Sequence, residues 1–115
     1  MPRSNSSVPR HRRHRKTIKL AKGQFGGRRK LYKTAKEGVE RGWQYAYRDR
    51  RQRKRDFRKL WISRINAAVR QYDMNYSTFM HLISEKGIEL NRKQLSEMAI
   101  HEPGAFAELV KTVKK

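Results

Sequence analysis

The sequence predicts an all-α protein with three parts: a disordered basic N-terminal tail, a long bent basic helix and a small C-terminal helical domain. The net charge of +20 arises entirely in residues 1–72, which carry 24 Lys and Arg against 4 Asp and Glu. Residues 73–115 carry 6 of each kind and can fold as an ordinary small domain. No stretch alternates apolar and polar residues for long enough to form a strand, while several stretches follow the period of a helix.

Residues 1–27 form the predicted tail and a glycine turn. The first part of the tail mixes Pro, Ser, Asn and cations around one interior apolar side chain, Val8, so nothing there drives collapse. Gly23, Gly26 and Gly27 then break any helix and allow the backbone to approach another surface closely. This spacing of glycines fits either a turn that a phosphate approaches closely or a plain flexible turn.

Residues 28–72 contain no proline and are rich in helix-forming side chains, which predicts one long helix or two in line. At about 1.5 Å per residue this helix would extend for roughly 65 Å, so much of it must stand clear of its own core. Gly38 and Gly42 each weaken it by about 1 kcal/mol relative to Ala. We therefore expect a bend near residues 38–43.

Residues 48–59 hold eight cations in twelve positions, spread around the whole helix, with Phe57 as the only apolar side chain. A single basic run is typical of a solvated face or a targeting signal. Here it is accompanied by basic clusters at residues 10–22 and 28–36. The combination favours a polyanionic partner, on which the first two-thirds of the chain depends for its fold.

Acidic neighbours cannot neutralise this charge. Asp49 can pair with Arg53 one helical turn later, and Lys36 with Glu40. Exposed pairs of this kind contribute only about 0.3–0.5 kcal/mol each. Most of the cations are therefore available to a partner.

Aromatic residues interleave with the cations. Cations neutralise phosphates, while aromatic rings stack on unpaired bases or lie against sugars, a combination suited to folded RNA. Such a ring can also anchor the long helix on its own domain, and neighbouring aromatics at Tyr45 and Tyr47 cannot share one helix face. The interleaved aromatics are Phe25, Tyr32, Trp43, Tyr45, Tyr47 and Phe57.

Residues 73–115 are expected to form a small globular helical domain packed on the end of the long helix. Apolar side chains recur at helical spacing along that end and predict a buried stripe. The stripe consists of Phe57, Leu60, Trp61, Ile65, Ala68, Val69 and Tyr72.

Capping signals divide this domain into three further helices. Asn75 or Ser77 can cap the first, which Gly87 ends. Asn91 with Gln94 three residues later predicts a capping box for the second. Pro103 suits the first turn of the last. Their apolar faces contain Tyr76, Phe79, Met80, Ile83, Leu95, Met98, Ala99, Phe106, Leu109, Val110 and Val113.

The residues form no recognisable catalytic or metal-binding pattern. The chain has no cysteine, and the glycines are not followed by the Lys-Ser or Lys-Thr of a phosphate loop. His11 and His14 lie among arginines without acidic partners, and His81 and His101 lack a metal-binding spacing. We therefore expect no enzyme activity, no cofactor, no metal and no small-molecule substrate. No apolar run approaches the length that spans a bilayer, so we expect a cytoplasmic protein without a membrane partner.

The chain contains three distinctive sequence blocks: AKGQFGGRRKLY at 21–32, YAYRDRRQRKRDFRKLWISRINAA at 45–68 and YSTF at 76–79. These blocks resemble the bacterial large-subunit ribosomal protein twenty, or L-twenty, family. The later IELNRK at 88–93 and Ala105-Phe106 are similar too, so the resemblance covers nearly the full length. The chain departs from the family at Gln24, where we expect an aromatic residue, and at Trp43, where we expect a smaller one.

The resemblance implies a structural constituent of the large ribosomal subunit. Such a protein binds directly to 23S-type ribosomal RNA, is required for early subunit assembly and has no role in peptidyl transfer. Neighbouring large-subunit ribosomal proteins are further implied partners. Some relatives also repress their own messenger RNA through the helical domain, an extension that is not visible in this sequence.

Both the family resemblance and the interleaved aromatics indicate candidate RNA-binding residues. The resemblance assigns contacts to cations and one glycine, and the interleaving pattern adds three tyrosines. The set is Arg10, Arg12, Arg13, Arg15, Lys16, Lys22, Gly23, Arg28, Arg29, Tyr32, Tyr45, Tyr47, Arg48, Arg50, Arg51, Arg53, Lys54, Arg55 and Arg58.

Two other classes of protein share the basic composition. A DNA-compacting architectural protein needs only backbone contacts, often with wedges inserted into a narrow groove. A basic amphipathic membrane binder needs an apolar face, which residues 48–59 lack. A preference for structured RNA over duplex DNA distinguishes the RNA-binding interpretation from the first of these.

Overall fold

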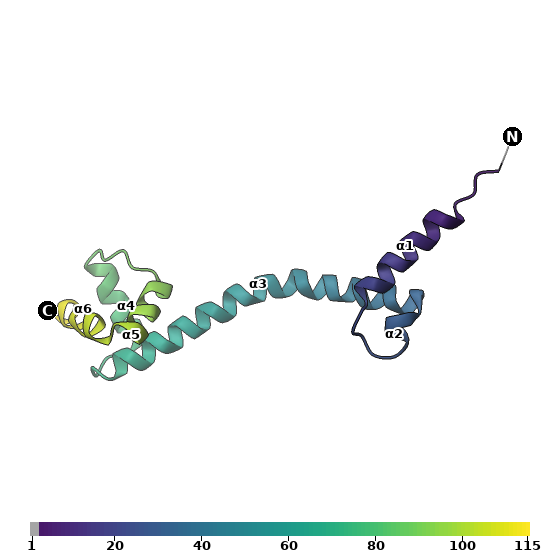
Figure 1. The fold of residues 1–115 in the computed structure, drawn as a ribbon. Coiled ribbons are helices and arrows are strands. Elements are labelled where there is room, and N and C mark those ends of the chain that lie inside the picture. Colours follow the sequence, from purple (N-terminus) through teal and green to yellow (C-terminus); the bar gives the residue numbers. More distant parts are fainter. Residues whose placement is uncertain (1–2) are drawn as a thin grey trace. The chain divides into compact units, whose positions relative to one another are not determined.

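The computed structural model describes residues 3–115, which are mostly helical (Figure 1). Within this range there is no strand, which confirms the all-α prediction. The first two residues of the predicted tail lie outside the described residues. The helices of residues 3–115 are α1 (Ser7–Leu20), α2 (Gly27–Lys30), α3 (Tyr32–Arg70), α4 (Tyr76–Glu85), α5 (Arg92–His101) and α6 (Pro103–Lys114).

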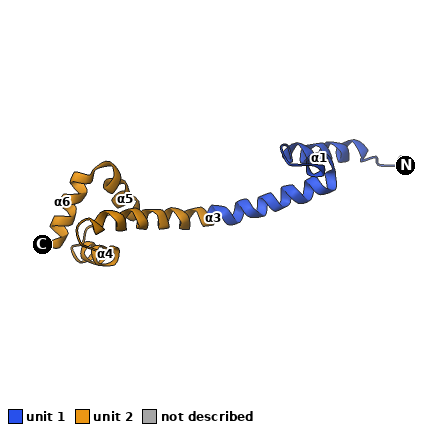
Figure 2. Cartoon of the chain, turned by 90° about the horizontal axis from the view of Figure 1, so that it is seen from below, with its two compact units in different colours: residues 1–51 blue, residues 52–115 orange. Residues whose placement is uncertain are grey.

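The chain divides into two compact units, Met1–Arg51 and Gln52–Lys115 (Figure 2). The N-terminal unit contains α1, α2 and the first part of α3. The C-terminal unit contains the remainder of α3 together with α4, α5 and α6. Each unit has an apolar core of its own.

Helix α1 occupies a segment for which the sequence predicts disorder, and this corrects the prediction. Arg and Lys are good helix formers, and Pro9 lies in the first turn, where its missing N–H leaves no helical bond unmade. Near the end of α1, Ile18 packs against a small buried core of Ala21, Ala35 and Val39. Two of these partners belong to α3, so the composition of the tail alone does not reveal them.

A break at Leu31 separates α2 from α3. Leu31 is extended, with φ −91° and ψ 125°. The Thr34 hydroxyl lies within hydrogen-bonding distance of the carbonyl oxygens of Gly27, at 3.0 Å, and of Leu31, at 3.1 Å. The helix predicted from residue 28 is therefore a short α2 followed by a long α3, and no proline or glycine at the break signals this division.

Helix α3 is a single element of 39 residues, which confirms the predicted long helix. It continues through Gly38 and Gly42 and ends at Arg70. Gly38 has a packing role, because Gln24 Oε1 lies 2.6 Å from the position that a Cβ at residue 38 would take. The bend expected near residues 38–43 stays a prediction.

The core of the C-terminal unit combines α3 with the three short helices. The rings of Phe79 and Phe106 meet at its centre, with centroids 5.7 Å apart. The predicted stripe begins later than expected, because Phe57 is 48% exposed and Leu60 40% exposed. The buried members of this core are Ile65, Val69, Phe79, Ile83, Leu95, Phe106, Val110 and Val113.

The predicted caps of the C-terminal unit are present. The Asn75 side chain accepts a hydrogen bond from the Thr78 backbone N–H at the start of α4. Asn91 and Gln94 form the complete capping box of α5, with both hydrogen bonds at 2.9 Å. Pro103 occupies the first turn of α6. These local signals fix where each helix begins.

Candidate nucleic-acid interface

Helix α1 carries five of the candidate RNA-binding residues. All five are exposed, and the first turn of α1 contains no acidic residue. Their positive charges face solvent and remain open to an anionic partner. They are Arg10, Arg12, Arg13, Arg15 and Lys16.

The turn between α1 and α2 contributes a second group. Lys22 and Gly23 lie in the turn, whereas Arg28 and Arg29 belong to α2, and all four are exposed. Gly23 has a φ of 87°, and a Cβ at this position would meet no atom within 4 Å. Its backbone is thus open to close approach by another molecule, as the glycine pattern predicts.

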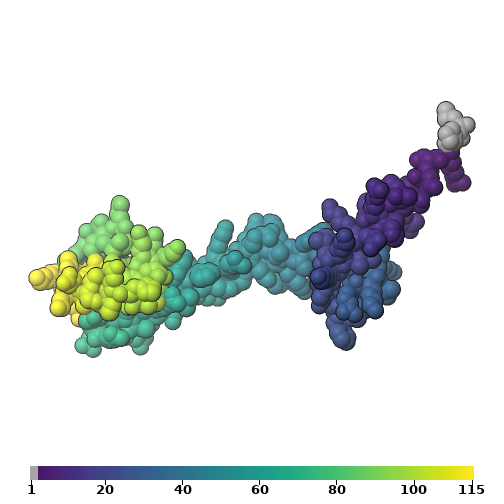
Figure 3. All heavy atoms as spheres, in the orientation of Figure 1, coloured from purple at the N-terminus to yellow at the C-terminus, as the bar shows by residue number. Residues whose placement is uncertain are grey.

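Helix α3 carries the largest group of candidate cations. All of them are exposed, and the part of α3 that carries them is drawn in teal in the space-filling view (Figure 3). Because they occur at nearly consecutive positions, they point in all directions around the helix. They are Arg48, Arg50, Arg51, Arg53, Lys54, Arg55 and Arg58.

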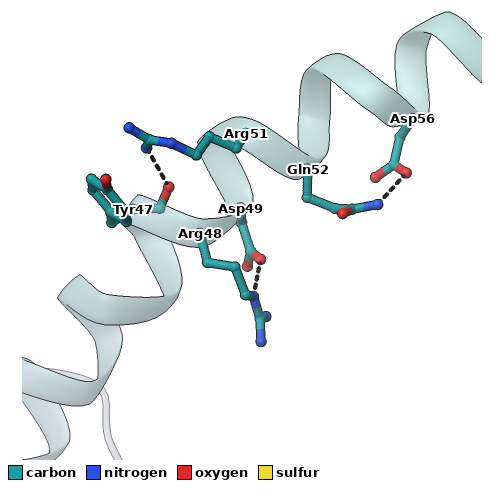
Figure 4. A network of polar contacts seen from close by, with 6 residues as sticks. All are labelled: Tyr47, Arg48, Asp49, Arg51, Gln52 and Asp56. Carbon is teal, nitrogen blue, oxygen red and sulfur yellow. Dashed lines mark hydrogen bonds and ion pairs between the residues drawn. The ribbon is translucent and has the colours of Figure 1, made fainter.

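Few of these cations have a carboxylate partner. Asp49 pairs with Arg48, at 2.8 Å, and this corrects the predicted pairing with Arg53 (Figure 4). Asp56 accepts a hydrogen bond from the neutral amide of Gln52, also at 2.8 Å. Within residues 3–115, Arg48 is the only candidate cation with an ion pair to a carboxylate.

The hydrogen bond to Asp49, and then its negative charge, raise the pKa of Arg48. The guanidinium is therefore charged at every physiological pH. The predicted pair of Lys36 and Glu40 is confirmed at 3.9 Å, and both side chains remain about half exposed. A pair of this kind contributes little to stability.

The candidate tyrosines are each in contact with a basic side chain. The ring of Tyr32 stacks on His14, with centroids 3.6 Å apart. The guanidinium of Arg48 lies 4.7 Å from the ring centroid of Tyr45. Arg51 lies 3.8 Å from that of Tyr47 and also donates a hydrogen bond to the Tyr47 carbonyl oxygen at 3.1 Å (Figure 4).

The spacing of these residues in the sequence predicts some of these contacts but not all of them. Positions three or four apart on a helix are neighbours, which accounts for both Tyr–Arg contacts on α3. The stack of His14 on Tyr32 joins two helices, so sequence spacing gives no sign of it. One face of each tyrosine ring is therefore covered by the protein itself.

Two grooves cross the surface of the N-terminal unit. We call the larger, of about 810 Å³, the turn groove, and the smaller, of about 560 Å³, the α1 groove. The turn groove is lined chiefly by Gln24, Phe25, Arg28, Glu37, Arg41 and Tyr45. The α1 groove is lined chiefly by Arg10, Arg13, His14, Lys16, Tyr32 and Trp43.

The grooves add residues that the sequence-based candidate set lacks. Phe25 is 97% exposed beside the turn groove, and Trp43 is 61% exposed beside the α1 groove. Glu37 and Arg41 enter the turn groove one helical turn apart. Phe25 and Trp43 belong to the aromatics that interleave with cations in the sequence, and the glycines that flank Phe25 are a second signal for it.

Several cations of the C-terminal unit make contacts within that unit. Lys86 donates a hydrogen bond to the Thr112 carbonyl oxygen at 2.8 Å, and Arg92 donates one to the Tyr76 hydroxyl at 2.7 Å. Lys114 donates to the carbonyl oxygen of Tyr72. These side chains stabilise the packing of α4–α6, in contrast to the cations of α1 and α3.

Residues 3–115 contain neither a cluster of metal ligands nor a membrane-spanning helix. No group of three or more His, Asp or Glu side chains there could hold a metal ion. None of the helices in the same range is both long and apolar enough to cross a membrane.

Similarity to known proteins extends over nearly the whole chain. Residues 3–109 match the family model described as ribosomal protein L20. The large ribosomal subunit protein bL20 of Carboxydothermus hydrogenoformans is 53% identical over 115 residues, covering 100% of this chain and 98% of that relative. The protein of the same name from Staphylococcus aureus strain JH9 is 57% identical over 114 residues, covering 99% and 97%. The strain Newman protein gives the same values.

Proposed function

Because the chain belongs to the ribosomal protein L20 family, we propose that it binds directly to 23S-type ribosomal RNA and is required early in large-subunit assembly. Membership of the family confirms the resemblance seen in the three sequence blocks. In this proposal the protein is a structural part of the cytoplasmic ribosome. It takes no part in peptidyl transfer.

The observation that carries the proposal is the set of exposed cations on α1, α2 and α3 that lack carboxylate partners. Each such cation can neutralise a phosphate and release a bound counterion, which favours association with a polyanion. Arginines outnumber lysines in this set, and their planar guanidinium groups can bind phosphate oxygens through two hydrogen bonds.

Exposed aromatics favour RNA over duplex DNA. Unpaired bases of folded RNA can stack on aromatic side chains, whereas bases inside a duplex cannot. Phe25, Trp43, Tyr45 and Tyr47 are all exposed on the N-terminal unit. A DNA-compacting protein has no need of such rings on its surface unless they act as wedges.

Neighbouring ribosomal proteins are the second proposed class of partner. Phe57 and Leu60 remain exposed on α3 in the C-terminal unit, where a protein or RNA neighbour could cover them. The proposal does not extend to the protein's own messenger RNA, which no feature of α4–α6 identifies as a ligand.

A competition experiment tests the RNA-binding part of the proposal. The protein is bound to a labelled fragment of large-subunit RNA at moderate salt, and unlabelled RNA or duplex DNA is added. We expect the RNA to displace the label at a much lower concentration than the DNA does. Equal competition by duplex DNA would favour the architectural alternative.

The assembly role needs a separate measurement. Depletion of the protein in cells should lead to incomplete large-subunit particles on a sucrose gradient, while small subunits sediment normally. Expression of the intact chain should restore the complete particle. Normal large subunits that lack the protein would overturn the assembly role and leave RNA binding as a separate question.

A further inference from the structure

The turn groove combines side chains that phosphate binding does not require. It contains an exposed aromatic ring, carboxylates and amides as well as arginines, and its volume of about 810 Å³ is ample for a nucleobase. All of its lining residues belong to the N-terminal unit. The side chains best placed to contact a bound base or its phosphates are Phe25, Glu37, Gln24, Arg28 and Arg41.

We propose that the turn groove binds one unpaired guanine of the RNA, with Phe25 stacked on the base and Glu37 accepting hydrogen bonds from its Watson–Crick edge. The inference rests on the proposed RNA-binding function and adds a base-specific contact to it. Phosphate contacts position a protein on RNA, whereas contacts to base edges supply specificity.

Phe25 is suited to stacking because its ring is 97% exposed and packs on nothing in its own unit. Gly23 and Gly26, with φ of 87° and 63°, lie on either side of it in the turn. A large apolar ring in full contact with water is unfavourable in the free protein, and a stacked base would cover it. Tyr45, also in the groove, is less available since Arg48 covers one of its faces at 4.7 Å.

Glu37 is unusual because acidic residues are rare in the N-terminal unit. From residue 3 to residue 48 the only two are Glu37 and Glu40, and both line the turn groove. Glu40 is paired with Lys36 at 3.9 Å, whereas Glu37 makes no ion pair among the described residues. A carboxylate repels phosphates and only accepts hydrogen bonds, so the RNA groups that Glu37 can bind are hydrogen-bond donors.

Guanine is the base that supplies those donors. Its Watson–Crick edge carries the N1–H and N2–H groups side by side, and the two oxygens of a carboxylate only accept hydrogen bonds. On that edge adenine offers one donor group beside an acceptor, cytosine one donor group beside two acceptors, and uracil a donor between two acceptors. Proteins that bind RNA commonly recognise unpaired bases through hydrogen bonds to this edge.

The surroundings of the groove fit a nucleotide. Arg28 and Arg41 line it and can bind the adjacent phosphates. Gln24 is seated over Gly38, with Oε1 2.6 Å from the position of a missing Cβ, so its amide forms part of the groove wall. Side-chain amides offer further donors and acceptors to the base.

The test uses RNA hairpins that differ only in one bulged nucleotide, which is G, A, C, U or inosine, together with a hairpin without a bulge. Equilibrium binding is measured for the full-length protein at one ionic strength. We expect the G bulge to bind roughly tenfold more tightly than the A, C or U bulge, the discrimination typical of a two-bond base contact. Inosine lacks the N2 amino group and should give an intermediate affinity.

Two substitutions assign the preference to the groove. Glu37→Gln removes a negative charge, so electrostatics alone would tighten binding to every hairpin. We expect it to abolish the preference for G instead. Glu108→Gln on α6 makes the same change in net charge outside the groove and should keep the preference. Phe25→Leu should weaken binding to all bulged hairpins by about fivefold or more and leave the unbulged hairpin unchanged.

The outcomes separate this inference from the function on which it rests. Equal affinity for all five bulges, or a preference for G that survives Glu37→Gln, would overturn the guanine site while RNA binding stands. Failure to bind any hairpin or any large-subunit RNA fragment would overturn the RNA-binding function itself. Circular dichroism of each variant checks that the helices are intact.

Discussion

The imidazole of His14 lies flat against the ring of Tyr32, with centroids 3.6 Å apart and planes inclined by 14°. The stack joins α1 to the first residue of α3. Helix α1 contains no fully buried side chain, so we infer that its attachment depends on this contact together with the packing of Ile18 against Ala35 and Val39.

Acidification should loosen α1. Partial burial lowers the pKa of His14 from its ordinary value of 6.5, and Arg10, Arg13 and His11 act in the same direction. The unfolded state therefore binds more protons than the folded state near this pH, and stability is lost as the pH falls below 6.5. Backbone chemical shifts of α1 between about pH 7.5 and 5 should show reduced helicity at the acidic end.

Substitutions at the two histidines of α1 provide the control. His14→Phe keeps an aromatic stack that cannot be protonated, so the helicity of α1 should become independent of pH in this range. His11→Phe should keep a pH dependence, reduced only slightly, because His11 is the smallest of the influences that lower the pKa of His14. A helicity of α1 that is insensitive to pH before any substitution would show that the stack does not hold it.

Core packing sets the stability of the C-terminal unit. Phe79 is fully buried and its ring meets that of Phe106, so Phe79→Ala should lower the free energy of unfolding by about 3–5 kcal/mol. Phe57→Ala removes the same ring from a half-exposed position and should have a much smaller effect. Urea unfolding followed by circular dichroism measures both, and equal effects would contradict the observed packing.

Ser96, unlike Phe79, is a buried residue with a polar side chain. Its side chain is fully buried on α5 and its hydroxyl has no hydrogen-bond partner. An unsatisfied buried hydroxyl costs about 1–3 kcal/mol, so Ser96→Ala should raise the free energy of unfolding by about 1 kcal/mol. Ser84→Ala, at an exposed position on α4, is the matched control and should change it little. Destabilisation by Ser96→Ala would show that the hydroxyl is bonded in solution.

The elements that could be predicted from the sequence are those specified locally. The capping box of Asn91 and Gln94 involves residues three positions apart, and the first turn of α6 needs only Pro103. The helical period of the apolar side chains likewise identified the core around Phe79 and Phe106. Each of these signals acts within one or two helical turns.

The missed elements depend on contacts between distant segments. The sequence-based prediction of disorder in the tail counted apolar side chains within the tail, but Ile18 packs on Ala35 and Val39 of α3. For the same reason, the candidate cations could be named from the family resemblance, whereas the turn groove could not be predicted from the sequence. That groove exists because the turn at Phe25 approaches Glu37 on α3.

The salt dependence of RNA binding tests the central claim, that unpaired cations of α3 contact RNA phosphates. We compare the unmodified chain with a variant in which Arg50, Arg51, Arg53 and Lys54 are all replaced by Gln, and with one in which the three arginines become Lys. Loss of four phosphate contacts should lower the affinity for a large-subunit RNA fragment and reduce the slope of log K against log salt by about 3 to 4. The Lys variant keeps the charge and should keep the slope. An unchanged affinity and slope in the Gln variant would contradict the claim.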